Sequence, residues 1–274
     1  MKSTEIIIDA DRSITRFWKE LWEYKDLFYF LAWRDILVRY KQTAIGIAWS
    51  VLRPLLTMVV FTIVFGKIAK LPSNDVPYPV LVFTAMLPWQ FFSNTFTETS
   101  NSLIANNQLI SKVFFPRIII PTTAMVVSLI DFAISFGILV FLMIWYGVVP
   151  DVRCILLPLL LIIVVLNSLG AGYIISALNV KYRDFRYVVP FIVQLGLYIS
   201  PVGFSSSVVP ENWRFLYSLN PMVGVIDGFR WGLLGSEVSI YWPGFFISIF
   251  FSIFLFLFGV HYFNRTERSF ADVI

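Results

Sequence analysis

Hydrophobic residues form six long runs along the 274-residue chain, separated by shorter polar stretches. A helix needs about 20 mostly apolar residues to cross a bilayer. The pattern therefore predicts six transmembrane helices, at roughly 46–67, 80–103, 118–147, 154–179, 188–204 and 243–263. The third and fourth runs are long enough to tilt or to extend beyond the bilayer, whereas the fifth is short.

The residues before the first run follow a different pattern. Apolar side chains recur at positions i, i+3, i+4, i+7 and i+8, namely Ile14, Phe17, Trp18, Leu21 and Trp22. Charged residues occupy the opposite face, so we expect an amphipathic helix within 14–40 that lies in the membrane interface. This helix either anchors the chain to the membrane surface or also docks a cytoplasmic partner. No signal peptide is expected, because the first 40 residues contain no apolar core and no cleavage site.

The segment 205–242 is too polar to span a membrane and too aromatic for a free loop. Pro210 and the pair Asn220-Pro221 are typical of helix starts, and Gly235 of a helix stop. We expect two short helices, at about 210–218 and 221–234. Helices that do not span are tolerated at membrane depth where protein or a water-filled cavity covers them. The segment therefore indicates a gate or lining element, with a simple extracellular cap as the alternative.

Composition supports an all-α integral membrane protein. Hydrophobic residues make up 58% of the chain and charged residues only 14%, and the mean hydropathy is +0.78. Soluble domains carry about 25% charged residues, so an ordinary soluble enzyme and a disordered chain are excluded. A single cysteine, Cys154, and a single histidine, His261, rule out an internal disulfide and argue against a metal site. No phosphate-binding loop of the G-x-x-x-x-G-K-[ST] type occurs, so the chain is expected to be non-catalytic and to bind no metal.

The basic residues predict the orientation. Sixteen of the 21 Lys and Arg residues fall on the side of the chain termini, and positive charge favours the cytoplasmic face. We expect both termini in the cytoplasm and no nucleic acid partner. The expected division is a cytoplasmic N-terminus at 1–44, a transmembrane domain at 45–263 and a cytoplasmic tail at 264–274.

Two acidic residues lie within the predicted spans. Asp131 falls in the middle of the third span, and Glu98 lies near the inner end of the second. A buried acid is costly, so each should face a partner or a wet path. Asp131 is expected either to make structural hydrogen bonds or to line a transport path.

Four separate strings resemble one known family. Residues 27–53 read LFYFLAWRDILVRYKQTAIGIAWSVLR, and residues 102–117 read SLIANNQLISKVFFPR. Residues 181–201 read KYRDFRYVVPFIVQLGLYISP, and residues 220–235 read NPMVGVIDGFRWGLLG. In this order the strings resemble the permease subunit of ABC-2-type polysaccharide and polyol exporters. This family includes the O-antigen permease Wzm and the teichoic acid permease TagG.

The resemblance implies an architecture and partners. The family has an interface helix, six spans and two short gate helices on the outer side before the last span. It works as a homodimer with two copies of a separate, Wzt-like ATPase subunit, which binds ATP and Mg, so no cofactor is expected in this chain. In the family, the interface helix and the loop between spans two and three dock the ATPase. The residues expected to make these contacts here are Lys112, Phe114, Phe115 and Arg117.

The resemblance also implies a substrate, a long glycan on an undecaprenyl diphosphate carrier. It would cross the cytoplasmic (inner) membrane through a channel between two permeases. O-antigen is the first choice and capsule or teichoic acid the second. An exporter of small hydrophobic compounds, a membrane glycosyltransferase or polymerase and a channel are further alternatives.

Three sets of residues form the resulting site hypothesis. The diphosphate head group would enter beside cationic groups near the first span, because guanidinium groups suit phosphate oxygens; positive-inside topology is the alternative explanation. These residues are Arg39, Tyr40, Lys41 and Arg53. The glycan would slide past aromatic rings that make many weak contacts, namely Trp49, Trp89, Phe92, Tyr198 and Phe204. The outer gate would be lined or braced by Trp213, Phe229, Arg230 and Trp231.

Overall fold

The computed structural model describes residues 22–41, 46–73, 75–182, 184–235, 240–267 and 270. All regular structure in these ranges is helical, as the sequence predicts. Four helical segments are long and apolar enough to cross a membrane: Ala48–Ile68, Ile119–Tyr146, Val152–Lys181 and Trp242–Thr266. They correspond to the first, third, fourth and sixth hydrophobic runs.

The first of these segments combines α3 (Gly46–Phe61) with the π-helix η1 (Thr62–Ile68). The second is α6 (Ile119–Tyr146), which ends at Gly147 in the left-handed conformation. The third joins the short 3₁₀ helix η2 (Val152–Leu156) to α7 (Leu157–Lys181), and the fourth is α11 (Trp242–Thr266).

The second and fifth hydrophobic runs form helices of a different character. Helix α4 (Tyr78–Ala105) has 28 residues, and most residues in its first half are buried. It contacts α3, α6, α7, α8 and α10. It is the central helix, which explains why it tolerates a more polar sequence. Helix α8 (Phe185–Ile199) has 15 residues, about 22 Å at 1.5 Å per residue. It ends before Ser200-Pro201, since a residue that precedes proline avoids helical geometry.

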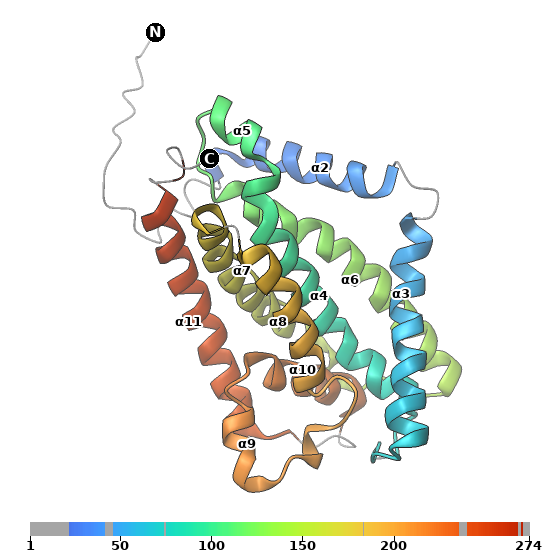
Figure 1. Ribbon diagram of the computed structural model, residues 1–274. Coiled ribbons are helices and arrows are strands. Elements are labelled where there is room, and N and C mark those ends of the chain that lie inside the picture. The colour runs from blue at the N-terminus through green and yellow to red at the C-terminus, as the bar shows by residue number, and fades with distance from the viewer. Residues whose placement is uncertain are drawn as a thin grey trace.

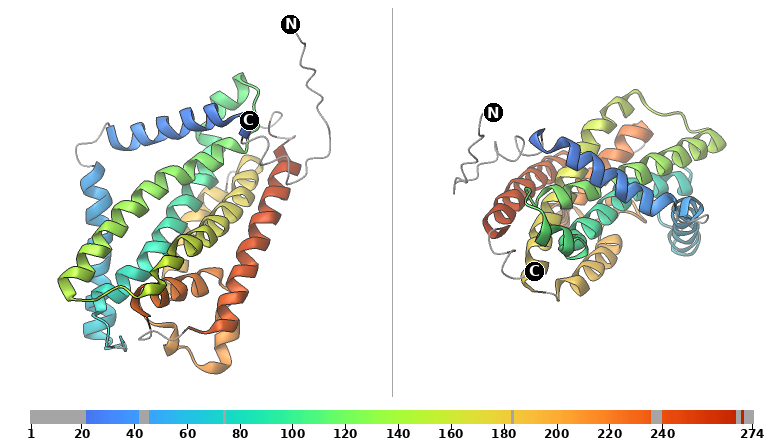
Figure 2. Two further views of the ribbon diagram at one scale, coloured as in Figure 1. Left: turned by 180° about the vertical axis from the view of Figure 1, so that it is seen from behind. Right: turned by 90° about the horizontal axis from the view of Figure 1, so that it is seen from above.

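Helix α2 (Lys25–Lys41) lies across one end of the bundle. Seen from above, it crosses over α4 and α6 (Figure 2) and buries Leu31 and Ala32. It is followed by α3, which lies at the opposite edge of the bundle from α11 (Figure 1). The amphipathic face predicted at 14–21 lies outside the described residues, and Trp22 is exposed.

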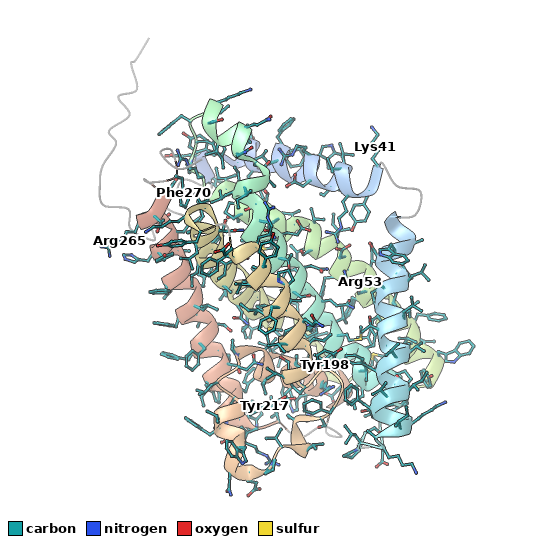
Figure 3. The ribbon with its side chains drawn as sticks, in the orientation of Figure 1. Lys41, Arg53, Tyr198, Tyr217, Arg265 and Phe270 are labelled. Carbon is teal, nitrogen blue, oxygen red and sulfur yellow. The ribbon has the colours of Figure 1, made fainter. Side chains whose placement is uncertain are left out.

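The two ends of the bundle differ in their short helices. Helix α5 (Asn107–Lys112) lies in the loop expected between the second and third spans, at the same end as α2 (Figure 1). Figure 3 shows Lys41, Arg265 and Phe270 near this end and Tyr217 near the other. The predicted short helices appear there as α9 (Glu211–Tyr217) and α10 (Pro221–Leu234), after the turn η3 (Ser206–Val208). The Asn220 side chain caps α10 by accepting a hydrogen bond from Met222 N.

Small residues allow α7 and α11 to cross closely. A Cβ added to Gly170 would lie 2.6 Å from the backbone of Leu255, and one added to Gly259 would collide with the Gly170 carbonyl oxygen. In membranes, such contacts replace the hydrophobic drive that holds soluble helices together. The pair therefore fixes the position of α11 against the core.

Candidate functional site

A cavity of about 620 Å³ lies between α3, α4, α6 and α8. Helix α4 contributes a polar stripe to its wall, consisting of Gln90, Ser93, Asn94 and Thr97. These residues are spaced i, i+3, i+4 and i+7, so they share one face of the helix. Helix α8 adds Gln194, and α6 adds Ser128 and Ser135. The wall is therefore rich in hydrogen-bonding groups for a site between membrane helices.

Asp131 of α6 joins three helices at one side of this cavity. Its Oδ2 lies 2.6 Å from Arg39 Nη2 of α2, and its Oδ1 accepts a 2.6 Å hydrogen bond from the Tyr40 hydroxyl. The Ser50 hydroxyl of α3 donates a longer bond of 3.4 Å to the same Oδ1. The acid expected to need a partner thus has three.

Tyr40 is held as a hydrogen-bond donor at neutral pH. Burial raises its pKa to about 12, and the hydrogen bond to Asp131 and the charge of that carboxylate act in the same direction. The phenol therefore stays protonated and keeps donating to the carboxylate. This contact fastens the end of α2 to α6.

Arg53 of α3 also lines the cavity, and its side chain is exposed. Its backbone carbonyl accepts a hydrogen bond from Thr57, but within the described part of the chain no ion pair or hydrogen bond reaches its guanidinium. The charged groups in the lining are Arg39, Arg53 and Asp131, which leaves one positive charge in excess. The cavity therefore favours an anion.

The other predicted entrance residue, Lys41, is exposed at the end of α2 and does not line the described cavity. Tyr40 acts through Asp131 rather than from the wall. The structure thus brings Arg39 and Arg53 together around one space and places Tyr40 and Lys41 beside it.

The predicted channel aromatics divide in a similar way. Trp49 and Trp89 line the cavity from α3 and α4. Phe92 lies behind them, with its ring 5.5 Å from that of Trp89. Tyr198 is 58% exposed and lies 6.4 Å from Phe61, outside the cavity lining. Phe204 contributes its backbone carbonyl to a contact with Arg230.

Arg230 of α10 is fully buried and donates to three backbone carbonyls. Its Nη1 lies 2.7 Å from Phe204 O, and its Nη2 and Nε lie 3.2 Å from Val202 O and Leu81 O. These bonds connect α10 to the segment after α8 and to the central helix α4. Arg230 therefore braces the short helices from inside.

The other predicted gate residues have different surroundings. The Phe229 ring is buried and meets the cavity-lining Phe132 edge to face, at 6.3 Å. Trp231 contacts Trp242, and the Arg153 guanidinium lies 4.8 Å from its ring centre. Trp213 is exposed on α9. The chain of contacts from the cavity to α10 thus runs through Phe132 and Phe229.

The four predicted docking residues have different surroundings. Lys112 is exposed and the Phe114 side chain is 74% exposed, whereas that of Phe115 is only 5% exposed. The Arg117 backbone N–H and guanidinium donate to Glu267, at 2.9 and 3.0 Å. The surface offered to a partner thus contains Lys112 and Phe114, while Phe115 and Arg117 connect the loop to the end of α11.

Sequence reasoning missed the polar stripe of α4. Its signal was present, because polar residues at helical spacing inside an apolar run indicate a face turned away from lipid. It was overlooked because each of these residues is uncharged and unremarkable by itself.

Comparison with known proteins gives the class of this chain. The family described as "ABC-2 type transporter" matches residues 26–234. The chain belongs to this family, in agreement with the resemblance of its four strings. It is a non-catalytic transmembrane subunit, and an ABC transporter permease implies a partner ATPase subunit.

Individual relatives are more specific. The chain is 30% identical over 256 residues to an O-antigen export system permease protein of Klebsiella pneumoniae, covering 91% of this chain and 95% of the relative. It is 30% identical to a protein of the same description from Myxococcus xanthus, over 77% and 82% of the two chains. A capsule polysaccharide export inner-membrane protein of Neisseria meningitidis is 24% identical, over 83% and 86%.

Proposed function

We propose that this chain is the permease of an exporter that moves polysaccharide linked to undecaprenyl diphosphate across the inner membrane. O-antigen is the polymer that we favour, since two relatives at 30% identity are described as O-antigen permeases. The observation that carries the proposal is the cavity in which Arg39 and Arg53 outnumber Asp131 beside Trp49 and Trp89. An anionic head group and a sugar chain both find suitable partners there.

The two parts of the cavity wall have different tasks in this proposal. Guanidinium groups bind the oxygens of a diphosphate, and Arg53 has its donors available for this. The α4 stripe and the aromatic rings offer weak, repeated contacts to sugar hydroxyls and to the C–H faces of sugar rings. Sliding requires such contacts, because one tight site would hold the polymer in place.

The proposed transport unit is larger than one chain. Helices α4 and α8 would complete six crossings, with α8 extended by the segment that follows it. Two copies of the chain would form the channel, and both termini would lie in the cytoplasm. Two copies of a Wzt-like ATPase would bind ATP and Mg and would dock at α2 and α5. The exposed Phe114 and Lys112 support docking at this end.

Two alternative export functions are each weighed by one observation. Export of capsule or teichoic acid uses the same architecture, and the relative from Neisseria meningitidis is described as a capsule exporter. Export of small hydrophobic compounds would fit the family, but uncharged compounds would not pair with the excess positive charge of the cavity.

The proposal is tested in a deletion strain complemented with this gene. Surface glycan and undecaprenyl-linked polymer in the cytoplasm are both measured. Loss of surface glycan together with accumulation of full-length lipid-linked polymer is the expected result of deletion. Loss of both would indicate a defect in synthesis, and normal surface glycan would instead favour the exporter of small hydrophobic compounds.

A further inference from the structure

A second cavity, of about 550 Å³, lies under α2, between that helix, α4 and α6. Its lining includes charged and amide side chains, namely Arg34, Asp35, Glu98, Asn101 and Asn106. It lies at the end of the bundle that carries α2 and α5 (Figure 1).

One side chain, that of Arg39, lines both cavities. On the side of the main cavity its Nη2 lies 2.6 Å from Asp131 Oδ2, and on the other side its Nη1 lies 3.9 Å from Glu98 Oε1. Asp131 belongs to the lining of the first cavity and Glu98 to that of the second. Arg39 therefore stands between the two spaces, held by one carboxylate from each.

The contact between Arg39 and Asp131 engages one nitrogen of the guanidinium, Nη2, and one carboxylate oxygen, Oδ2. The other carboxylate oxygen, Oδ1, accepts from the Tyr40 hydroxyl instead. The arrangement therefore differs from the two parallel bonds of a bidentate arginine–carboxylate pair. A diphosphate presents more oxygens and more negative charge than one carboxylate.

The neighbouring contacts are better suited to stay in place. Arg34 is fixed by Asp35 at 2.7 Å and by Asn106 at 2.9 Å. The Tyr40 hydroxyl keeps its 2.6 Å bond to the other oxygen of Asp131. Arg39 can therefore change partner while α2 remains fastened to α6.

We propose that Asp131 acts as a latch on the path of the head group. Its carboxylate holds Arg39 between the two cavities until an anionic head group replaces the carboxylate as the partner of Arg39. The head group passes from the cavity under α2 into the main cavity as Arg39 exchanges carboxylate for phosphate oxygens. Asp131 is a positioning residue in this scheme, and Arg39 and Arg53 are the binding residues. The inference rests on the proposed function, because the anion is the diphosphate of the lipid carrier.

The test measures binding of radiolabelled farnesyl diphosphate to the full-length permease, purified with its ATPase in lipid nanodiscs. Farnesol is the uncharged control ligand. Asp131→Asn removes the competing carboxylate, and Glu98→Gln removes the weaker competitor on the other side. Glu211→Gln is the matched control, since Glu211 pairs with Arg214 on α9, far from both cavities.

We expect Asp131→Asn to lower the Kd for farnesyl diphosphate about fivefold to tenfold, or about 1 to 1.4 kcal/mol. Glu98→Gln should lower it about twofold, because its contact with Arg39 is longer and more exposed. Glu211→Gln should change nothing, and farnesol binding should be the same for all variants. An unchanged or raised Kd in Asp131→Asn, with the complex intact, overturns the latch.

Two further results are decisive. If Asp131→Asn fails to assemble with the ATPase, Asp131→Ser, which also removes the carboxylate, is measured in its place, and an unchanged Kd there overturns the latch. If the wild type binds farnesyl diphosphate and Arg53→Gln weakens this binding while both acid variants leave it unchanged, the latch is wrong and the proposed function stands. If the wild type binds farnesol and farnesyl diphosphate equally, the diphosphate site and the latch both fail.

Discussion

Two arginines of this protein have opposite surroundings. Arg230 is fully buried and donates hydrogen bonds to the backbone carbonyls of Leu81, Val202 and Phe204. Arg53 lines the open cavity and has its guanidinium available. A buried charge with satisfied donors holds structure together, whereas an exposed charge in a cavity can bind. The two residues should therefore respond differently to substitution.

Arg53→Gln should reduce glycan export at least tenfold and leave the amount of permease–ATPase complex unchanged, because it removes only the available cation. Surface glycan and co-purified ATPase are the two measurements. Lys67 is an exposed basic residue of the same span. Lys67→Gln is therefore the matched control, and this variant should export glycan normally. A parallel loss of complex in Arg53→Gln would make this residue structural.

Arg230→Met should destabilise the protein by about 3 kcal/mol or more, because two buried carbonyls and one part-buried carbonyl lose their donor. The readout is the midpoint of thermal unfolding in detergent. Arg214→Met, on the exposed helix α9, serves as the comparison and should shift the midpoint little. Equal shifts in the two variants would argue against the bracing role.

At the scale of elements, the closeness of a helix crossing depends on the residues that lie in it. Gly170 and Gly259 bring the backbones of α7 and α11 into contact, whereas Gly137 of α6 has no neighbour within 4 Å of an added Cβ. The space around a glycine thus differs from one position to another. Gly170 and Gly259 require the absence of a side chain, whereas Gly137 does not.

Gly259→Val should separate α7 from α11 and cost about 1 to 3 kcal/mol, the usual range for overpacking. Gly137→Val is the matched control, because its added atoms meet open space. Folded yield and the midpoint of thermal unfolding are measured for both. If the Gly137 variant loses as much as the Gly259 variant, the crossing does not explain the effect.

At the scale of the whole molecule, the proposed docking of the ATPase at the α2 and α5 end requires contacts that lead from this end to the cavity. Phe114 projects from this end, while its neighbour Phe115 packs with Phe263 and Phe270 in an internal cluster. The bond from Tyr40 to Asp131 then connects α2 to the cavity wall. The proposed docking surface, α2 and the cavity are therefore joined through packed side chains and one hydrogen bond.

Phe114→Ala should weaken assembly with the ATPase about tenfold without lowering thermal stability, because its side chain is exposed. Phe115→Ala should instead cost about 3 to 5 kcal/mol, the range for removing a buried phenylalanine side chain. Pull-down of the ATPase and thermal unfolding separate the two effects. Normal assembly in Phe114→Ala would show that Phe114 is not part of the docking surface.

The sequence by itself determined the helices, because periodicity and helix-ending residues are local signals. The short helices expected at 210–218 and 221–234 occur at Glu211–Tyr217 and Pro221–Leu234, for example. The membrane class followed from composition in the same way. The length of α8 was overestimated, since its hydrophobic run continues past Ser200-Pro201, where the helix cannot.

Only the tertiary structure decided which residues meet. Arg39 and Tyr40 reach Asp131 across more than 90 positions of the chain, and no local pattern encodes that contact. Phe114 and Phe115 are identical in type and adjacent, yet one is exposed and the other is buried. The difference arises because contacts such as those of Arg117 with Glu267 set how the loop lies against α11. Burial and charge pairing depend on the whole fold, so these properties of the site could not be obtained from the sequence.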